Sequence, residues 1–381
     1  MKIGIITFQR AYNFGAVWQA YALLSTLKSI GHKVEIIDYW PKYRDGHYSL
    51  SNSKKTRNAN KTFSVSNFKI VIENMLTFPD RWITNFKFSR FIKDSLEIRN
   101  SSYHSGSDTP DKYDVIICGS DQIWRYNFRN HRGFDEVYFA KYPLNTKVIK
   151  VSYGASMGDK DIDENAKKEL SAILKNFDFI SVREDSLLEL IRPLTTKLPI
   201  KVLDPVFLIA EPEWRKMIKR NTNKKKYLLF YQLLQNTEAA TLAKKIAKER
   251  QLEIIQIKGI VGKANPFESG NFNFSSGPVD FISLIAHADY VVSTSYHGVV
   301  FSILFRKPFS ALGFHHNSYR IKSLLKSLGI EHCLIENNSH NHPVDINYTS
   351  VNIPLEEMIK DSLCFLRHSI NNNGYNADIC V

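Results

Sequence analysis

The fold of this chain is predicted by residues 2–39, KIGIITFQRAYNFGAVWQAYALLSTLKSIGHKVEIIDY. Their apolar residues change from the pattern of a strand to the spacing of a helix and back to a strand. KIGIITF has the apolar pattern of a buried strand, a helical repeat follows it, and KVEIIDY returns to a strand after Gly31 ends the helix. The apolar stripe of the helix comprises Ala20, Leu23, Leu24, Leu27 and Ile30. A strand, a helix and a second strand within about forty residues are typical of a parallel, doubly wound sheet.

The same alternation continues in two successive series. DVIICGS, VIKVSYGAS and DFISVRE extend the first series as strands. A second series follows Asp204 and Pro205, with strands at KYLLFYQL, LEIIQIKG and Tyr290–Ser293 and helices between them. Proline and the run NTNKKK place the boundary near residues 205 to 225. We therefore expect an α/β protein with two Rossmann-like doubly wound domains at residues 1–205 and 206–350, and a C-terminal helix and mobile tail at 351–381.

Length and composition agree with two globular domains. The chain has 381 residues, of which 43% are hydrophobic, and this is enough apolar material for two cores of about 150 residues each. A formal net charge of +13 favours an anionic partner such as nucleic acid, a phosphorylated metabolite or an acidic membrane surface. The apolar N-terminus is too short for a signal peptide, and no window reaches the ~18 apolar residues that span a bilayer. These features predict a cytoplasmic protein.

Residues about 43–105 interrupt the first series with a basic and aromatic insertion. KKTRNANK is followed by FPDRWITNFKFSRFIK, in which Trp82, Phe86 and Phe91 stand among lysines and arginines. One interpretation is a solvated loop and amphipathic helices whose aromatic residues pack on the domain. Another is a peripheral surface at the inner face of the membrane that meets anionic lipid or a lipid-linked substrate. No recognisable nucleic-acid module accompanies the charge, so we expect no nucleic-acid partner.

Four polar motifs follow predicted strands, where ligands bind in open parallel sheets. They are YNFGAVWQ, GSDQIW, SVRED and STSYHG. Each motif also has a purely structural explanation. Asn13 and Gly15 could form a turn and a helix cap, and Asp121 could be an N-cap with Trp124 in the core. Arg183 and Glu184 could form ion pairs with each other or with neighbours. His297 could be a hydrogen-bonded structural histidine.

Six motifs in order carry a resemblance to a known family. NFGAVWQAYAL, VIICGSDQIW, VSYGASMG, ISVRED, VLDPVFL and ADYVVSTSYHGVVFSILFRKPF resemble the bacterial polysaccharide pyruvyl transferase family, over roughly residues 1–330. The resemblance implies two Rossmann-like domains facing across a cleft, as in glycosyltransferases of the B type. It also implies transfer of a pyruvyl group from phosphoenolpyruvate to a sugar of a cell-surface polysaccharide or its lipid-linked precursor. A cyclic ketal forms and phosphate leaves, and no cofactor is needed.

This chemistry requires one acid and one base. Histidine suits the acid because its pKa lies near neutrality, so we assign His297 to protonate the methylene carbon of phosphoenolpyruvate. Its position between a strand and a helix predicts that the backbone N–H groups of Gly298 and Val299 face an anion. Asp121 is the candidate general base.

Arginine is the expected ligand for phosphate and carboxylate groups. Arg183 occupies that position in SVRE, but many family members also carry an arginine two positions before the histidine, where this chain has Ser295 followed by Tyr296. We expect Arg320, after the strand PFSALG, to compensate. The adjacent Arg306 and Lys307 are excluded because they would lie about 14 Å from the histidine along a helix. The predicted phosphoenolpyruvate-binding residues are Arg183, Arg320, Ser295, Tyr296 and Gly298.

The sugar side is predicted from polar and aromatic residues near the first-domain strands. Amide oxygens can accept hydrogen bonds from sugar hydroxyls, and an indole can stack on the apolar face of a sugar. The predicted acceptor-binding residues are Asn13, Gln19, Gln122, Trp124 and Tyr153. No histidine or cysteine spacing indicates a metal site, so no structural metal is expected.

Two other functions fit the same sequence. One is a glycosyltransferase of the B type that uses a nucleotide sugar. The segment Tyr296–Lys307 lacks the acidic residues that a retaining enzyme of that type would be expected to place there. The other is a non-catalytic, anion-binding scaffold protein of polysaccharide assembly, whose binding would survive loss of His297, Arg183 and Asp121.

Overall fold

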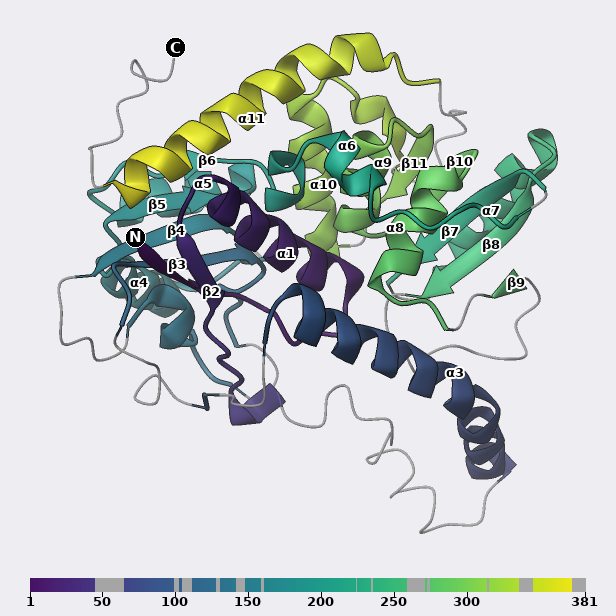
Figure 1. Cartoon of the computed structure of the whole chain (residues 1–381), viewed down its shortest axis with the longest axis horizontal. Helices are drawn as coiled ribbons and strands as arrows, with labels where there is room; N and C mark the ends of the chain where they lie inside the picture. The colour runs from purple at the N-terminus through teal and green to yellow at the C-terminus, as the bar shows by residue number, and fades with distance from the viewer. Residues whose placement is uncertain are drawn as a thin grey trace.

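The chain folds around two parallel β-sheets with helices on their faces (Figure 1). The computed structural model describes residues 1–44, 65–98, 103–104, 112–127, 131–141, 148–158, 161–223, 225–233, 236–258, 271–272, 275–313, 315–335 and 345–371. The predicted KKTRNANK loop and the terminal tail from residue 372 lie outside these residues.

The first sheet takes its strands from the N-terminal half of the chain. Its strands are β1 (Lys2–Ile6), β2 (Lys33–Ile36), β3 (Val115–Asp121), β4 (Ile149–Ala155), β5 (Phe179–Val182) and β6 (Ile200–Lys201), in the order β2-β1-β3-β4-β5-β6. Every pairing is parallel, and Ile5 lies opposite both Ile36 and Ile117. The strands are apolar because helices cover both faces of such a sheet. Strand order reverses direction between β1 and β3, which is the switch point of this sheet.

The second sheet has the strand order of a complete Rossmann unit. Its strands are β7 (Tyr227–Gln232), β8 (Glu253–Lys258), β9 (Asn271–Phe272), β10 (Tyr290–Ser293), β11 (Phe309–Leu312) and β12 (Leu334–Ile335), in the order β12-β11-β10-β7-β8-β9. All pairings are again parallel, and the switch point lies between β7 and β10. The two sheets confirm the predicted fold class of two doubly wound α/β domains. The predicted boundary falls in the interval between β6 and β7.

Helices connect the strands and fill the space between the two sheets. In the described residues they are α1 (Phe14–Ser29), α3 (Val65–Ser95), α4 (Glu164–Leu174), α5 (Asp185–Ile191), α6 (Glu211–Arg215), α7 (Thr237–Glu249), α8 (Pro278–His287), α9 (Tyr296–Leu304), α10 (His315–Ser327) and α11 (Tyr348–Ile370). Short 3-10 helices are η1 (Lys42–Arg44), η3 (Glu136–Phe139), η4 (Arg192–Leu194), η5 (Pro205–Leu208) and η6 (Glu331–Cys333). None of the described helices is both long and apolar enough to cross a membrane.

Helix α1 lies between the two domains. The Asn13 side chain caps it by accepting a hydrogen bond from Ala16 N at 3.2 Å, as its structural explanation predicted. The sequence predicted one apolar stripe, but the helix is buried on nearly all sides because α8, α9 and η5 cover its outer face. Trp18 Nε1 donates to Pro278 O at 3.0 Å, and Phe14 stacks on Phe281 with ring centroids 4.7 Å apart. Residues just before and within α1 therefore face the second domain.

The last helix returns to the first domain. Helix α11 packs on β4 and η5, and Leu203 N donates a hydrogen bond to Ser362 Oγ at 2.9 Å. The sequence predicted a C-terminal helix and tail at 351–381, whereas the helix begins at Tyr348 and holds Pro354 inside it. Figure 1 shows α11 crossing from the second domain over β6 and β5. At its start the Tyr348 hydroxyl donates to Lys307 O of the second domain at 2.6 Å, so the C-terminal helix contacts both domains.

Candidate active site

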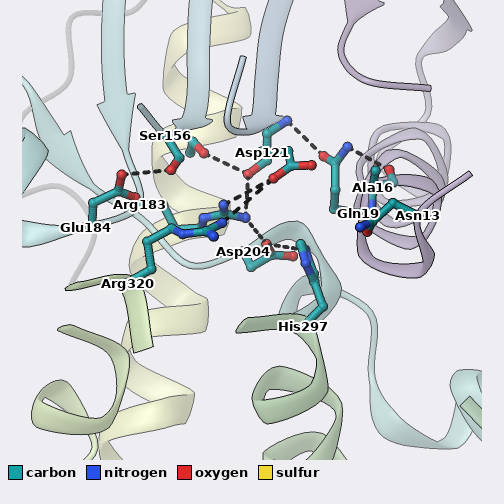
Figure 2. A network of polar contacts seen from close by, with 12 residues as sticks. Asn13, Ala16, Gln19, Asp121, Ser156, Arg183, Glu184, Asp204, His297 and Arg320 are labelled. Carbon is teal, nitrogen blue, oxygen red and sulfur yellow. Dashed lines mark hydrogen bonds and ion pairs between the residues drawn. The ribbon is translucent and has the colours of Figure 1, made fainter. Parts of the chain in front are cut away.

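Charged side chains from both domains meet where the carboxyl ends of the two sheets face each other (Figure 2). We call this group the charge cluster. It consists of Asp121 at the end of β3, Arg183 after β5, Asp204 before η5, His297 in the first turn of α9 and Arg320 in α10. Asp121 and His297 follow strands at the switch points of their sheets, where open α/β sheets bind ligands.

Asp204 joins the two domains within the charge cluster. Its carboxylate is fully buried, and Oδ2 contacts Arg183 Nη1 and lies 3.2 Å from His297 Nε2. Oδ1 accepts a hydrogen bond from Val206 N at 3.1 Å and so caps η5. Burial alone would raise the pKa of Asp204, but His297 and Arg183 outweigh it and bring the pKa to about 2. Asp204 therefore remains a carboxylate that contacts both Arg183 and His297.

Arg183 is the central cation. Besides Asp204, its guanidinium reaches Ser120 Oγ at 3.4 Å, and its Nη2 lies 3.6 Å from Asp121 Oδ1. Its Cζ lies 4.5 Å from the centre of the Tyr296 ring. Burial opposes the charge, but the nearby acidic groups, Asp204 first, raise the pKa of Arg183. The side chain is a permanent, buried cation.

Arg320 reaches the same groups from α10 of the second domain (Figure 2). Its Nη1 lies 3.9 Å from Asp121 Oδ1, and its Cζ lies 5.4 Å from the centre of the Tyr296 ring. Burial and the neighbouring Arg183 lower the pKa of Arg320 to about 10. Two guanidinium groups thus share one aromatic ring and one carboxylate. The sequence predicted that Arg320 reaches the site in the absence of an arginine at position 295, and the side chain does lie in this cluster.

Asp121 is the cluster residue with the most exposed side chain, at 14%. The chain reaches it through the cis peptide Gly119–Ser120, and Asp121 itself has a φ of 73°. Burial tends to raise the pKa of Asp121, but Arg183, His297 and Arg320 lower it below the ordinary value. Its carboxylate is ionised and faces both arginines.

His297 lies at the contact between the domains. A Cβ added to Gly15 of α1 would lie 1.9 Å from His297 Nδ1, so only glycine lets α1 approach the ring this closely. The residue is 5% exposed. Its Nε2 side faces Asp204 and its Nδ1 side faces Gly15, both of which belong to the first domain. The ring, carried by the second domain, therefore lies at the contact between the domains and not inside the second domain alone.

The predicted anion cradle at α9 needs a correction. Val299 N donates to Ser295 O at 3.1 Å in the ordinary helical pattern, so it is engaged within the helix. Ser295 is the N-cap residue of α9, and its own N–H donates to Ser293 Oγ at 3.0 Å. Gly298 is needed for packing, because a Cβ there would lie 2.1 Å from Ser293 Oγ. Among the residues predicted here, Tyr296 contacts the charge cluster directly, since its ring lies against both arginines.

The predicted acceptor residues lie mostly in the protein interior. Trp124 is fully buried, stacks on Phe139 and donates Nε1 to Tyr138 O at 3.2 Å, so it has no surface on which a sugar could stack. Tyr153 is also buried, and its hydroxyl donates to Leu203 O at 3.1 Å. Both aromatic residues support the sheet from behind the site.

The two predicted glutamines have different surroundings. Gln19 is fully buried and accepts from Ser120 N at 2.9 Å, which ties α1 to the segment that carries Asp121. Gln122 is half-buried, and its amide packs so closely on Gly158 that a Cβ there would lie 2.0 Å from Nε2. Gln122 therefore retains some surface beside Asp121, and Gln19 does not.

Three residues at this site had no functional role in the sequence prediction. Asp204 was read as part of the domain boundary although it stands in the VLDPVFL motif. Gly15 was read as a turn residue. Glu184 accepts from Ser156 Oγ at 2.8 Å, and its burial raises its pKa. Its structural explanation was an ion pair, whereas the side-chain partner that its carboxylate has here is the uncharged hydroxyl of Ser156.

No group of three or more histidine, cysteine, aspartate or glutamate side chains in the described residues is arranged to hold a metal ion. The charge cluster instead pairs its carboxylates with guanidinium groups. This arrangement suits the binding of an anion.

Sequence comparison identifies the family. The family model for polysaccharide pyruvyl transferases matches residues 13–316, which include the whole charge cluster except Arg320. The chain belongs to the polysaccharide pyruvyl transferase family. No curated protein matches this family member in sequence.

Solved structures with a similar fold are remote in sequence. The glycosyltransferase SnogD from Streptomyces nogalater is 10% identical, with 97% of this chain and 95% of that chain covered and a TM-score of 0.38. A UDP-GlcNAc 2-epimerase from Methanocaldococcus jannaschii is 11% identical, with 94% and 99% covered and a TM-score of 0.42. ADP-heptose LPS heptosyltransferase II from E. coli is 9% identical, with 95% and 99% covered and a TM-score of 0.29.

Proposed function

We propose that this family member transfers the pyruvyl group of phosphoenolpyruvate to two hydroxyls of a polysaccharide sugar, forming a cyclic ketal and releasing phosphate. The observation that supports it most is the pair of buried arginines, Arg183 and Arg320, which share Asp121 and Tyr296 next to His297. Phosphoenolpyruvate carries a phosphate and a carboxylate close together. Two planar guanidinium groups match that pair of anions.

The contact distances suggest how the anion would bind. Arg183 and Arg320 lie 3.6 and 3.9 Å from Asp121, which is longer than a hydrogen bond. The contact of Arg183 with Asp204 is much closer. An entering phosphoenolpyruvate would therefore replace Asp121 as the partner of the arginines, while Asp204 keeps Arg183 in position. The replacement would leave the Asp121 carboxylate available to a sugar hydroxyl.

His297 supplies the proton that starts the reaction. Its N–H bond breaks as a C–H bond forms at the methylene carbon, and the electron pair of the double bond makes that new bond. The neighbouring carbon becomes an oxocarbenium-like electrophile. Asp204 Oδ2, 3.2 Å from Nε2, orients the ring, as a buried carboxylate does for a catalytic histidine.

Asp121 receives the proton of the attacking hydroxyl. The hydroxyl oxygen bonds to the electrophilic carbon, and its O–H bond becomes acidic as the bond forms. A carboxylate of lowered pKa can accept such a proton late in the step. The bond from this carbon to the phosphate oxygen then breaks, and the proton held by Asp121 passes to the leaving phosphate. The second hydroxyl attacks the oxocarbenium-like carbon that this creates, its proton returns to His297, and the ketal closes. One phosphoenolpyruvate and one sugar diol give one ketal and one phosphate.

Entry of phosphoenolpyruvate requires movement at the domain contact. His297 packs against Gly15 of α1, and its ring is enclosed. We expect α1 and α9 to separate when substrate enters and to close again around it, which excludes water from the oxocarbenium-like intermediate.

The direct test is a product assay. Purified protein is incubated with phosphoenolpyruvate and a panel of free and lipid-linked sugars, and phosphate release and the mass of the sugar are followed together. We expect phosphate release that depends on a sugar and a matching gain of the pyruvyl mass. Cleavage of a nucleotide sugar, with phosphoenolpyruvate left intact, would instead show a glycosyltransferase.

A further inference from the structure

The outer side of α3 exposes large aromatic and aliphatic side chains. Phe78, Trp82, Ile83 and Phe86 are among the few large hydrophobic residues exposed in the described part of the chain, and we call them the aromatic face. Trp82 is 53% and Phe86 is 55% exposed, and their rings stack on each other with centroids 5.9 Å apart. Phe78, Trp82 and Phe86 are spaced by four residues, so they lie along one side of the helix.

The inner side of the same helix is ordinary core. Phe88 and Phe91 are buried, Phe91 lies 4.6 Å from Trp18 in ring centroids, and Phe88 lies 5.3 Å from Phe14. The sequence left two interpretations of the insertion open, and each of them describes some of its aromatic residues. Phe91 packs on the domain, whereas Trp82 and Phe86 face outward. Figure 1 shows the N-terminal part of α3 extending away from both sheets.

A groove runs between α3 and α8 beside the aromatic face. It has a volume of about 510 Å³, and Trp82, Ile83 and Phe86 line one wall while Pro278 and Val279 line the other. The groove is also lined by three cations, Lys87, Arg90 and Lys219, and by two carboxylates, Asp94 and Asp280. Asp280 is held between Lys87 and Lys219, and Arg90, whose side chain is 72% exposed, pairs with Asp94 at 3.3 Å. The three cations exceed the two carboxylates by one, so the rim keeps a net positive charge, in a chain with a formal net charge of +13.

We propose that the aromatic face and its basic rim dock this protein onto an anionic lipid bilayer. Exposed tryptophan and phenylalanine flanked by lysine and arginine match the boundary between lipid headgroups and acyl chains. The positive rim complements the negative charge of acidic lipids, which contribute a salt-dependent attraction. The contact is peripheral, because α3 rests on the domain through its inner side. It does not depend on the reaction proposed above.

The test is co-sedimentation of the full-length protein with lipid vesicles. Vesicles of phosphatidylcholine with phosphatidylglycerol are compared with vesicles of phosphatidylcholine alone. We expect binding to the anionic vesicles that weakens when the salt is raised to about 0.5 M, where charges are strongly screened. The double variant Trp82→Ser/Phe86→Ser should bind about tenfold more weakly, because the inserted aromatic rings are lost.

Two exposed apolar residues elsewhere provide the matched control. Leu198 is 69% and Ile353 is 65% exposed, and neither lies in α3 or α8. The variant Leu198→Ser/Ile353→Ser should bind vesicles as the wild type does. Equal binding by the wild type and the Trp82→Ser/Phe86→Ser variant would overturn the proposal, as would no binding of the wild type to anionic vesicles. If sedimentation velocity shows instead that the aromatic-face variant turns a dimer into a monomer while vesicle binding is unchanged, the face joins two copies and the proposal is wrong.

Discussion

The charge cluster and the aromatic face both depart from the usual distribution of side chains, in which charged groups are exposed and apolar groups are buried. The cluster holds five ionisable residues between the domains, four of them buried, whereas the face exposes four large apolar residues on α3. Buried charges are costly unless they are paired, so a substitution in the cluster should change the stability of the fold as well as its function. Exposed apolar groups cost the folded state little, so a substitution in the aromatic face should leave the stability nearly unchanged. Substitutions in the two regions should therefore have different signatures.

The largest expected effect is on turnover in the charge cluster. His297→Ala removes the proposed acid, and we expect the kcat for pyruvyl transfer to fall about 10³-fold, within the range for loss of a general acid. Steady-state assays of phosphate release measure it, with circular dichroism to show that the fold is kept. The exposed His332→Ala serves as the control and should retain full activity. An active, folded His297→Ala enzyme would remove the histidine from the mechanism.

A smaller effect is expected on phosphoenolpyruvate binding. Arg320→Ala removes one of the two guanidinium groups, and we expect KM for phosphoenolpyruvate to rise about 30-fold, equivalent to about 2 kcal/mol of charge-assisted hydrogen bonding. The KM for the sugar should change far less. Arg215→Ala, at an exposed ion pair with Glu211, is the matched control. An unchanged KM for phosphoenolpyruvate would show that Arg320 does not compensate for Ser295.

The charge cluster should also give the protein an acid-sensitive stability. The folded-state pKa of Asp204 is about 2, which lies below the value of about 4 in an unfolded chain. Its contribution is therefore fully present above about pH 4 and is lost as the pH falls toward 2, by about 3 kcal/mol in total. Urea unfolding at several pH values should show the stability difference between wild type and Asp204→Asn shrinking in acid. Asp345→Asn, on an exposed side chain, should show no such trend, and a difference for Asp204→Asn that is constant with pH would contradict the assignment.

The smallest effect on folding is expected at the aromatic face. Trp82→Ser/Phe86→Ser should change the free energy of unfolding by no more than about 0.5 kcal/mol, since both side chains are more than half exposed. Trp214→Ala, at a fully buried tryptophan, should cost about 3–5 kcal/mol in the same urea experiment. A large loss of stability in the aromatic-face variant would mean that these residues belong to the core and would erase the contrast between the two regions.

The sequence predicted the fold well because the signals for it are local. The predicted strand Tyr290–Ser293 coincides with β10, and the alternation of strands and helices identified both sheets. His297, Asp121 and Arg183 each follow a parallel strand, and Arg320 lies in the helix after β11. The carboxyl ends of parallel strands share one edge of a sheet, so the topology itself brings these residues together.

The acceptor side was harder to predict for a physical reason. Strands of a parallel sheet are apolar on both faces. The sequence pattern around an aromatic residue near a strand end is therefore the same whether its side chain faces a ligand or the core. Trp124 and Tyr153 face the core. Asp204 was missed because an aspartate before proline resembles a boundary turn. Its contacts with Arg183 and His297 depend on the meeting of two domains, which no local pattern encodes.

The central claim is that the charge cluster binds phosphoenolpyruvate. The most direct measurement is the thermal stability of the protein with phosphoenolpyruvate and, separately, with nucleotide sugars. We predict that phosphoenolpyruvate stabilises the wild type, by about 2.7 kcal/mol at 100 times its dissociation constant, and that Arg320→Ala weakens this effect. Stabilisation by a nucleotide sugar, with none by phosphoenolpyruvate at any concentration, would contradict the account.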